Sequence, residues 1–157
     1  MKSQSAIEYL TTYGWAILVI AIALAVLYEL GLFSPSTYVH TSCIFEADFG
    51  CLGSTFTENG ILTINVEQST EGPINVTSIG CNSEPSISHM VAFSTPYTIP
   101  IGGNQTFVVQ CYMNNTTPYS GTIGDLYTGY VEMNYTDIQS GFPHTLTGEV
   151  QEKVISK

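Results

Sequence analysis

The chain has 157 residues, of which three are basic and 13 acidic, so its formal net charge is −10. Three lysines without arginine cannot form the basic surface that neutralises phosphates, which excludes nucleic acid as a partner. Apolar residues make up 44% of the chain, which excludes wholesale disorder.

The first predicted element is an apolar helix near the N-terminus. The run GWAILVIAIALAVLYELGLF extends from Gly14 to Phe33. Its length of about 20 residues is sufficient for the ~30 Å hydrocarbon core of a bilayer. Lys2 is the only basic residue nearby, which predicts a cytoplasmic N-terminus with the rest of the chain outside. Gly31 and Pro35 predict the end of the helix, followed by a linker over residues 34–37.

A single acid, Glu8, precedes the apolar run. The segment QSAIEYL from Gln4 to Leu10, followed by TTYGWAILVI, resembles the class III signal peptide of archaeal type IV pilins. The resemblance implies that a prepilin peptidase cuts between Ser3 and Gln4. Residues 1–3 would then be the leader, and the helix 4–33 would be retained. Glu8 would become the fifth mature residue, where type IV pilins carry a glutamate.

A carboxylate in a helix that enters an apolar environment must pair or become protonated. Cleavage would create an α-amine at Gln4, about one helical turn from Glu8, and the resemblance implies that this glutamate neutralises such an amine during assembly. Glu8 could instead lie at the headgroup boundary. Two other interpretations of the segment stay open: a secretory signal peptide cut after Ala21 or Ala23, and an uncleaved signal anchor.

Residues 38–157 change from a helical period to a period of two. In GILTINVEQ, apolar Leu62, Ile64 and Val66 alternate with polar residues. Further alternating segments give Ile74 and Val76; Tyr97, Ile99 and Ile101; Phe107, Val109 and Cys111; and Val131, Met133 and Tyr135. Short strands separated by turns predict an all-β, immunoglobulin-like sandwich, so the expected fold class is α+β. Archaeal pilins commonly carry a β-sandwich head, so the resemblance implies the same fold.

The four cysteines all follow the membrane segment, on the predicted outside. Cys43 and Cys51 bracket a short loop, while Cys81 and Cys111 lie on the apolar faces of their strands. This pattern favours the disulfides Cys43–Cys51 and Cys81–Cys111. A metal site and free buried thiols are the alternatives, although no C-x-x-C spacing occurs.

Five of the eight asparagines stand in N-x-T sequons: Asn75, Asn104, Asn114, Asn115 and Asn134. These residues are predicted N-glycosylation sites. Asn114 and Asn115 overlap, so we do not expect both to be used. A Thr- and Asn-rich surface could also contain sequons incidentally.

The sequence contains no recognised catalytic pattern. It has no G-x-S-x-G, no phosphate-binding loop and no Ser–His–Asp arrangement. We therefore predict no enzymatic activity, no catalytic residue and no cofactor. Glu46 and Asp48 could contribute to Ca²⁺ binding, but their loop offers too few oxygens, so no metal site is predicted.

These features predict a structural subunit of an archaeal type IV pilus-like filament. The precursor would lie in the cell membrane, and the mature chain would form a helical homo-oligomer on the cell surface. The expected role of this filament is adhesion to surfaces or other cells. Its other partners would be the prepilin peptidase and the assembly machinery. The alternatives are a single-pass anchored extracellular binding module that does not polymerise, and an anchored hydrolase.

Overall fold

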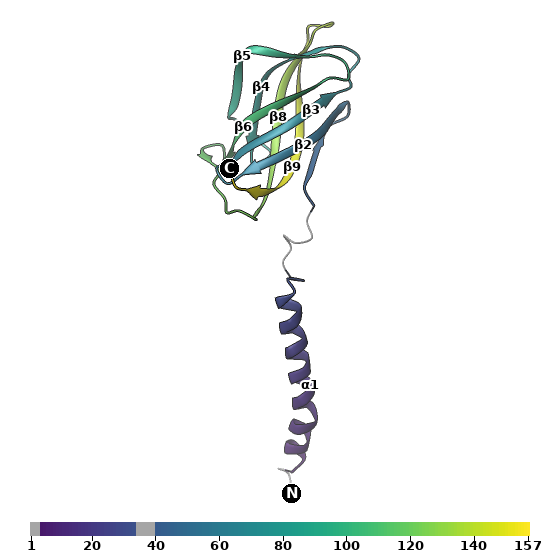
Figure 1. The fold of residues 1–157 in the computed structure, drawn as a ribbon, viewed down its shortest axis with the longest axis vertical. Coiled ribbons are helices and arrows are strands. Elements are labelled where there is room, and N and C mark those ends of the chain that lie inside the picture. Colours follow the sequence, from purple (N-terminus) through teal and green to yellow (C-terminus); the bar gives the residue numbers. More distant parts are fainter. Residues whose placement is uncertain (1–3, 34–39) are drawn as a thin grey trace. The chain divides into compact units, whose positions relative to one another are not determined.

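The computed structural model describes residues 4–33 and 40–157, which belong to two compact units. The first contains the helix α1, Gln4–Glu29, and the second is a strand-rich domain that begins at His40 (Figure 1). The prediction of an apolar helix followed by a strand-rich domain is confirmed. Ser3 and the predicted linker 34–37 lie outside the described residues.

Helix α1 has 26 residues, which corresponds to a length of about 39 Å. It ends at Glu29, because Gly31 adopts a positive φ of 69°. The Gly31 N–H donates to the Tyr28 carbonyl at 2.9 Å, and the Leu32 N–H donates to the Leu27 carbonyl at 3.2 Å. These two bonds form a Schellman motif, the C-cap that glycine favours. The regular helix therefore stops before Phe33, and the predicted stop signal at Gly31 is confirmed.

The second unit consists of strands joined by turns and loops. Its strands are β1 Ser42–Phe45, β2 Phe49–Thr57, β3 Ile61–Gln68, β4 Ile74–Asn82, β5 Met90–Ile99, β6 Asn104–Met113, β7 Thr117–Pro118, β8 Leu126–Asp137 and β9 Pro143–Ile155.

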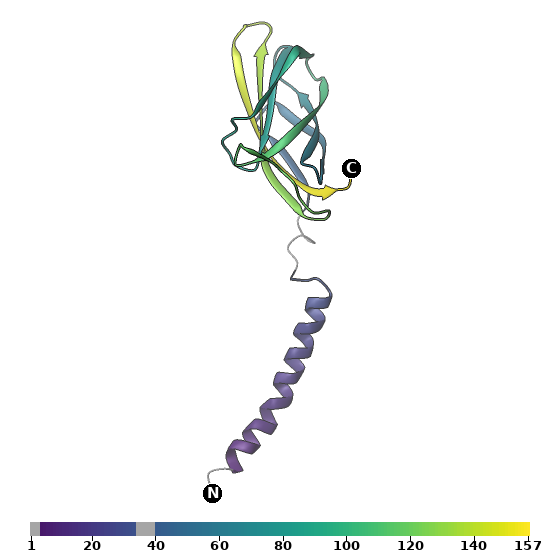
Figure 2. The same cartoon turned by 90° about the vertical axis from the view of Figure 1, so that its left-hand side faces the viewer.

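The strands form two antiparallel groups that join into a closed ring. One group runs β5-β4-β8-β9 and the other β2-β3-β6-β7, while β1 pairs with β9. Short parallel pairings, β2 with β9 and β4 with β6, connect the groups. Strands β4, β8, β9, β2, β3 and β6 therefore surround a common interior (Figure 2). The arrangement is barrel-like and is not clearly the predicted immunoglobulin-like sandwich, because non-local pairings at both junctions close the sheet.

The interior is filled by the apolar faces that the period of two predicts. Leu62, Ile64 and Val66 are all buried, as are the following residues from the other predicted strands: Ile74, Val76, Ile99, Phe107, Val109, Cys111, Val131 and Met133. Tyr97 and Ile101 are exposed, contrary to their alternation with Ile99. Ile101 lies in the turn that follows β5, and β5 pairs with β4 through a shifted register, so the alternation does not hold along this segment.

Gln68 is a fully buried polar residue that organises one end of the barrel. Its Nε2 donates to the carbonyls of Gly72 and Ile99 at 3.3 and 3.2 Å, and its Oε1 accepts from the Thr70 amide at 2.9 Å. The Gln68 amide donates to the Gly103 carbonyl, and the Gly102 amide donates back to the Gln68 carbonyl. Gln68 thus connects the β3–β4 turn to the β5–β6 turn.

Replacing Gln68 with Ala is expected to lower the free energy of unfolding by about 1–3 kcal/mol, because buried backbone groups lose their partners. Urea unfolding measures the change. Gln139→Ala is a matched control, since Gln139 is an exposed glutamine in another turn. Equal stability of the two variants would show that the Gln68 network does not stabilise the fold.

Candidate functional site

Helix α1 carries a long apolar surface, which is exposed within its own unit. Its segment Ile7–Glu29 is long and apolar enough to cross a membrane. Large side chains such as Trp15, Ile17 and Leu18 are exposed. An apolar surface of this extent requires lipid or protein around it.

Glu8 is an exposed acid near the start of this helix. The neighbouring hydroxyls are satisfied within the helix, because Thr11 donates to the carbonyls of Ile7 and Glu8, and Thr12 donates to the Glu8 carbonyl. No described side chain pairs with the Glu8 carboxylate. The Glu8 carboxylate is therefore available for a partner outside the described residues. Gln4 begins α1, so the two residues are four positions apart on one helix.

The four cysteines form the two predicted disulfides, Cys43–Cys51 and Cys81–Cys111. Each lies beside a junction of the barrel. Cys81 and Cys111 are opposite each other in the parallel β4–β6 pairing and are fully buried. Cys43 on β1 pairs with Val150 of β9, so its bond to Cys51 joins β1, held on β9, to β2. Both disulfides therefore reinforce the joints between the two antiparallel groups.

Removing the disulfides by Cys→Ala pairs is expected to destabilise the domain to different degrees. The chain-entropy model gives about 3.6 kcal/mol for the Cys81–Cys111 separation of 30 residues and about 2.5 kcal/mol for the Cys43–Cys51 separation of 8. Guanidinium unfolding of the two double variants measures both. A larger loss for the Cys43/Cys51 variant would contradict the expected order.

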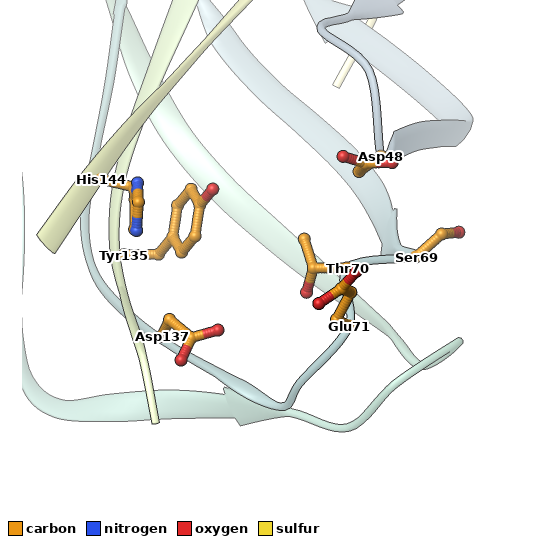
Figure 3. A pocket seen from close by; sticks show the side chains of 7 residues that line it. All are labelled: Asp48, Ser69, Thr70, Glu71, Tyr135, Asp137 and His144. Atoms are coloured by element: carbon orange, nitrogen blue, oxygen red, sulfur yellow. The ribbon is translucent and has the colours of Figure 1, made fainter. Parts of the chain in front are cut away.

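A polar cleft of about 360 Å³ lies at the end of the barrel that Gln68 organises. Tyr135, Asp137 and His144 from the β8–β9 hairpin face the turn residues across the open space (Figure 3). The opposite wall consists of Asp48, Ser69, Thr70 and Glu71.

The cleft is acidic, with three carboxylates and no lysine among its lining residues. The Tyr135 ring lies against His144, with ring centroids 5.3 Å apart, and against Phe49 at 5.2 Å. Burial raises the pKa of Tyr135, and the charges of Asp137, Asp48 and Glu46 raise it further. A backbone hydrogen bond from Ser140 lowers the pKa of Asp137. The hydroxyl of Tyr135 therefore stays protonated at physiological pH.

The lining of the cleft can form hydrogen bonds with a ligand, and its negative charge favours a ligand with positive charge. Among residues 4–33 and 40–157, no three His, Cys, Asp or Glu side chains are close enough together to hold a metal ion. Glu46, which the sequence places near Asp48, accepts a hydrogen bond from the Thr147 hydroxyl instead of lining the cleft. His40, His89 and His144 come from separate parts of the sequence and belong to no such group among the described residues.

Glu152 on β9 is a buried acid that the strand analysis did not single out. Its carboxylate accepts a hydrogen bond from the Ser54 hydroxyl and lines a recess beside the Cys43–Cys51 disulfide. Burial raises the pKa of Glu152, although the bond from Ser54 opposes the shift. The sequence pattern could have predicted the burial of Glu152, because this residue alternates with Val150 and Val154, which both face the interior.

Replacing Glu152 with Gln is expected to stabilise the domain at pH 8, by up to about 1 kcal/mol after solvent screening. Below the usual value of 4.5, the carboxyl is protonated in both the folded and the unfolded chain, so little change is expected at pH 4. As the pH rises through the higher folded pKa, the wild-type protein must ionise a buried group and loses stability relative to the variant.

Urea unfolding at pH 4, 6 and 8 measures this dependence. Glu149→Gln, at an exposed position of the same strand, is the matched control and should show no such trend. A Glu152→Gln variant that is less stable than the wild type at pH 8 would contradict the expectation.

The predicted sequons occupy different parts of the domain. Asn75 lies on β4 and Asn134 on β8, whereas Asn104 begins β6. Asn114 and Asn115 follow the end of β6, both with a positive φ. Comparison of the chain with protein-family models and with curated proteins gives no match.

Proposed function

We propose that this chain is the structural subunit of an archaeal type IV pilus-like surface filament that assembles through α1. The observation that carries the proposal is the uncovered apolar surface of α1, which is interrupted near its start by the exposed carboxylate of Glu8. A helix that is apolar on all sides must be covered by lipid or by other helices. Copies of the same helix would provide this cover in a filament core, and the resemblance of residues 1–33 to archaeal type IV pilins supports that choice.

The N-terminal residues would take part first in cleavage of the precursor and then in assembly of the mature subunit. A prepilin peptidase would cut between Ser3 and Gln4 on the cytoplasmic side, while the precursor is held in the membrane. The new amine at Gln4 and the carboxylate of Glu8 are separated by about 6 Å along a helix axis. The Glu8 carboxylate of one subunit would pair with the amine of its neighbour, which removes two isolated charges from the apolar core.

The strand-rich domain would form the outer surface of the filament. Its two disulfides are suited to an oxidising exterior, and its exposed residues would contact the surfaces to which the filament would adhere. Adhesion is the role that we propose for this outer surface.

A second candidate is a single-pass anchored extracellular binding module that does not polymerise. The cleft lined by Tyr135, Asp137 and His144 favours this candidate, because several polar groups converge on one open space. The two functions differ in the fate of the N-terminus. Processing at Gln4 and polymerisation are required by the first and not by the second.

Replacing Glu8 with Ala is expected to abolish filament assembly while leaving the protein in the membrane, because the carboxylate is needed for docking and not for insertion. Electron microscopy of producing cells counts the filaments, and membrane fractionation measures insertion. Mass spectrometry of the mature N-terminal peptide should give Gln4 in both the wild type and the variant.

Glu29→Ala is the matched control, since it removes the acid at the other end of α1 and should leave assembly intact. Normal filaments from the Glu8→Ala variant would refute the pairing role. An unprocessed terminus and an absence of filaments in the wild type would instead support the anchored binding module.

A further inference from the structure

The side-chain amides of the five sequon asparagines are used in different ways. N-linked glycosylation attaches a sugar to Nδ2, so the reaction requires an amide that is exposed and not already held by the fold. Hydrogen bonds and exposure separate the five residues into two groups.

Both polar atoms of the Asn115 side-chain amide make hydrogen bonds. Its Nδ2 donates to the Ser86 carbonyl at 2.6 Å, and its Oδ1 accepts from the Ser88 amide at 2.8 Å. Its backbone amide also donates to Oδ1 of the buried Asn82 at 3.3 Å. Asn115 therefore fastens the loop between β4 and β5 to the turn that follows β6, and a sugar on Nδ2 would compete with this contact.

Asn134 is held in the same way at the centre of a sheet. Its Nδ2 donates to the Ser78 hydroxyl at 3.1 Å, and its Oδ1 accepts from the Thr145 hydroxyl at 2.8 Å. These bonds connect β8 to its neighbours β4 and β9.

Asn75 is half-buried on β4 between β5 and β8. Its Oδ1 accepts from the Thr98 hydroxyl at 2.6 Å. This side chain thus also belongs to the contacts between strands of the sheet.

Asn104 and Asn114 are different, because both are exposed and neither makes a side-chain hydrogen bond with another described residue. Asn104 is the first residue of β6, and Asn114 follows its last residue, so the two lie at opposite ends of this strand. Asn104 shares the outward face of β6 with Thr106 and Val108, which are both exposed.

We propose that Asn104 and Asn114 carry N-linked saccharides, whereas Asn115 and Asn134, whose Nδ2 atoms are hydrogen-bonded, and the half-buried Asn75 stay unmodified. The donor would be a saccharide linked to a lipid phosphate. The bond between the sugar C1 and the phosphate oxygen breaks, a bond between C1 and Nδ2 forms, Nδ2 loses one proton and the lipid phosphate leaves. The inference rests on the extracellular placement in the proposed function, and not on polymerisation.

Glycopeptide mass spectrometry of the protein from its native cells tests the assignment. We expect saccharide masses on the peptides with Asn104 and Asn114, and unmodified Asn75, Asn115 and Asn134. A saccharide on any of the last three, or its absence from Asn104 or Asn114, would overturn the assignment. The result is independent of filament formation, which electron microscopy of the same cells reports separately.

The overlapping sequons allow a matched pair of variants. Thr116→Ala removes the sequon of Asn114 and preserves that of Asn115, so the protein should lose one saccharide. Thr117→Ala removes only the sequon of Asn115, so the saccharide should remain. The opposite pattern in the intact mass would place the modification on Asn115 and overturn the proposal.

Stability provides a second readout. Asn104→Gln should lose one saccharide mass, whereas Asn134→Gln should keep all of them and unfold at a lower temperature, because the longer side chain cannot hold both Ser78 and Thr145. An Asn134→Gln variant that loses a saccharide mass would also overturn the proposal.

Discussion

The closure of the barrel depends on two joints with few backbone hydrogen bonds. The β2–β9 and β4–β6 pairings each involve two residue pairs, whereas the β8–β9 pairing extends from Leu126 to Thr136. Without further connections, the two antiparallel groups could separate at these joints. The disulfides at Cys81–Cys111 and Cys43–Cys51 supply covalent connections beside them. The enclosed core, the cleft and the positions of the sequons all rely on this closure.

The two units require different surroundings. The barrel has an apolar core of its own, although side chains such as Ile44, Val108 and Phe142 are exposed on it, while α1 exposes apolar side chains along its length. Burying an apolar side chain gains about 1.5–3 kcal/mol, so the helix, which has no apolar core of its own, has more to gain from a partner than the barrel. Any assembly of this chain is therefore expected to be driven by the helix.

Local patterns in the sequence predicted much of the fold. The alternation of Leu62, Ile64 and Val66 identified the core face of β3, and Gly31 identified the end of α1. The closed arrangement could not be predicted, because Cys81 and Cys111 meet in a parallel pairing between distant strands. Gln68 and Glu152 follow the apolar alternation of their strands, yet their polar character hid their burial. The cleft joins turns far apart in the sequence, which no local pattern reveals.

The position of the Cys43–Cys51 bond has a mechanical consequence. The chain enters the barrel through β1, which has only four residues. Tension applied from the N-terminal side would reach Cys43 after a single residue of that strand and would then pass through the covalent bond into β2. The segment between the two cysteines, which are eight residues apart and would span about 28 Å when extended, therefore carries no tension. The force therefore bypasses the weak β1–β9 hydrogen bonds and is borne by the longer β2–β3 ladder, so the domain resists being unravelled from the end to which α1 is attached.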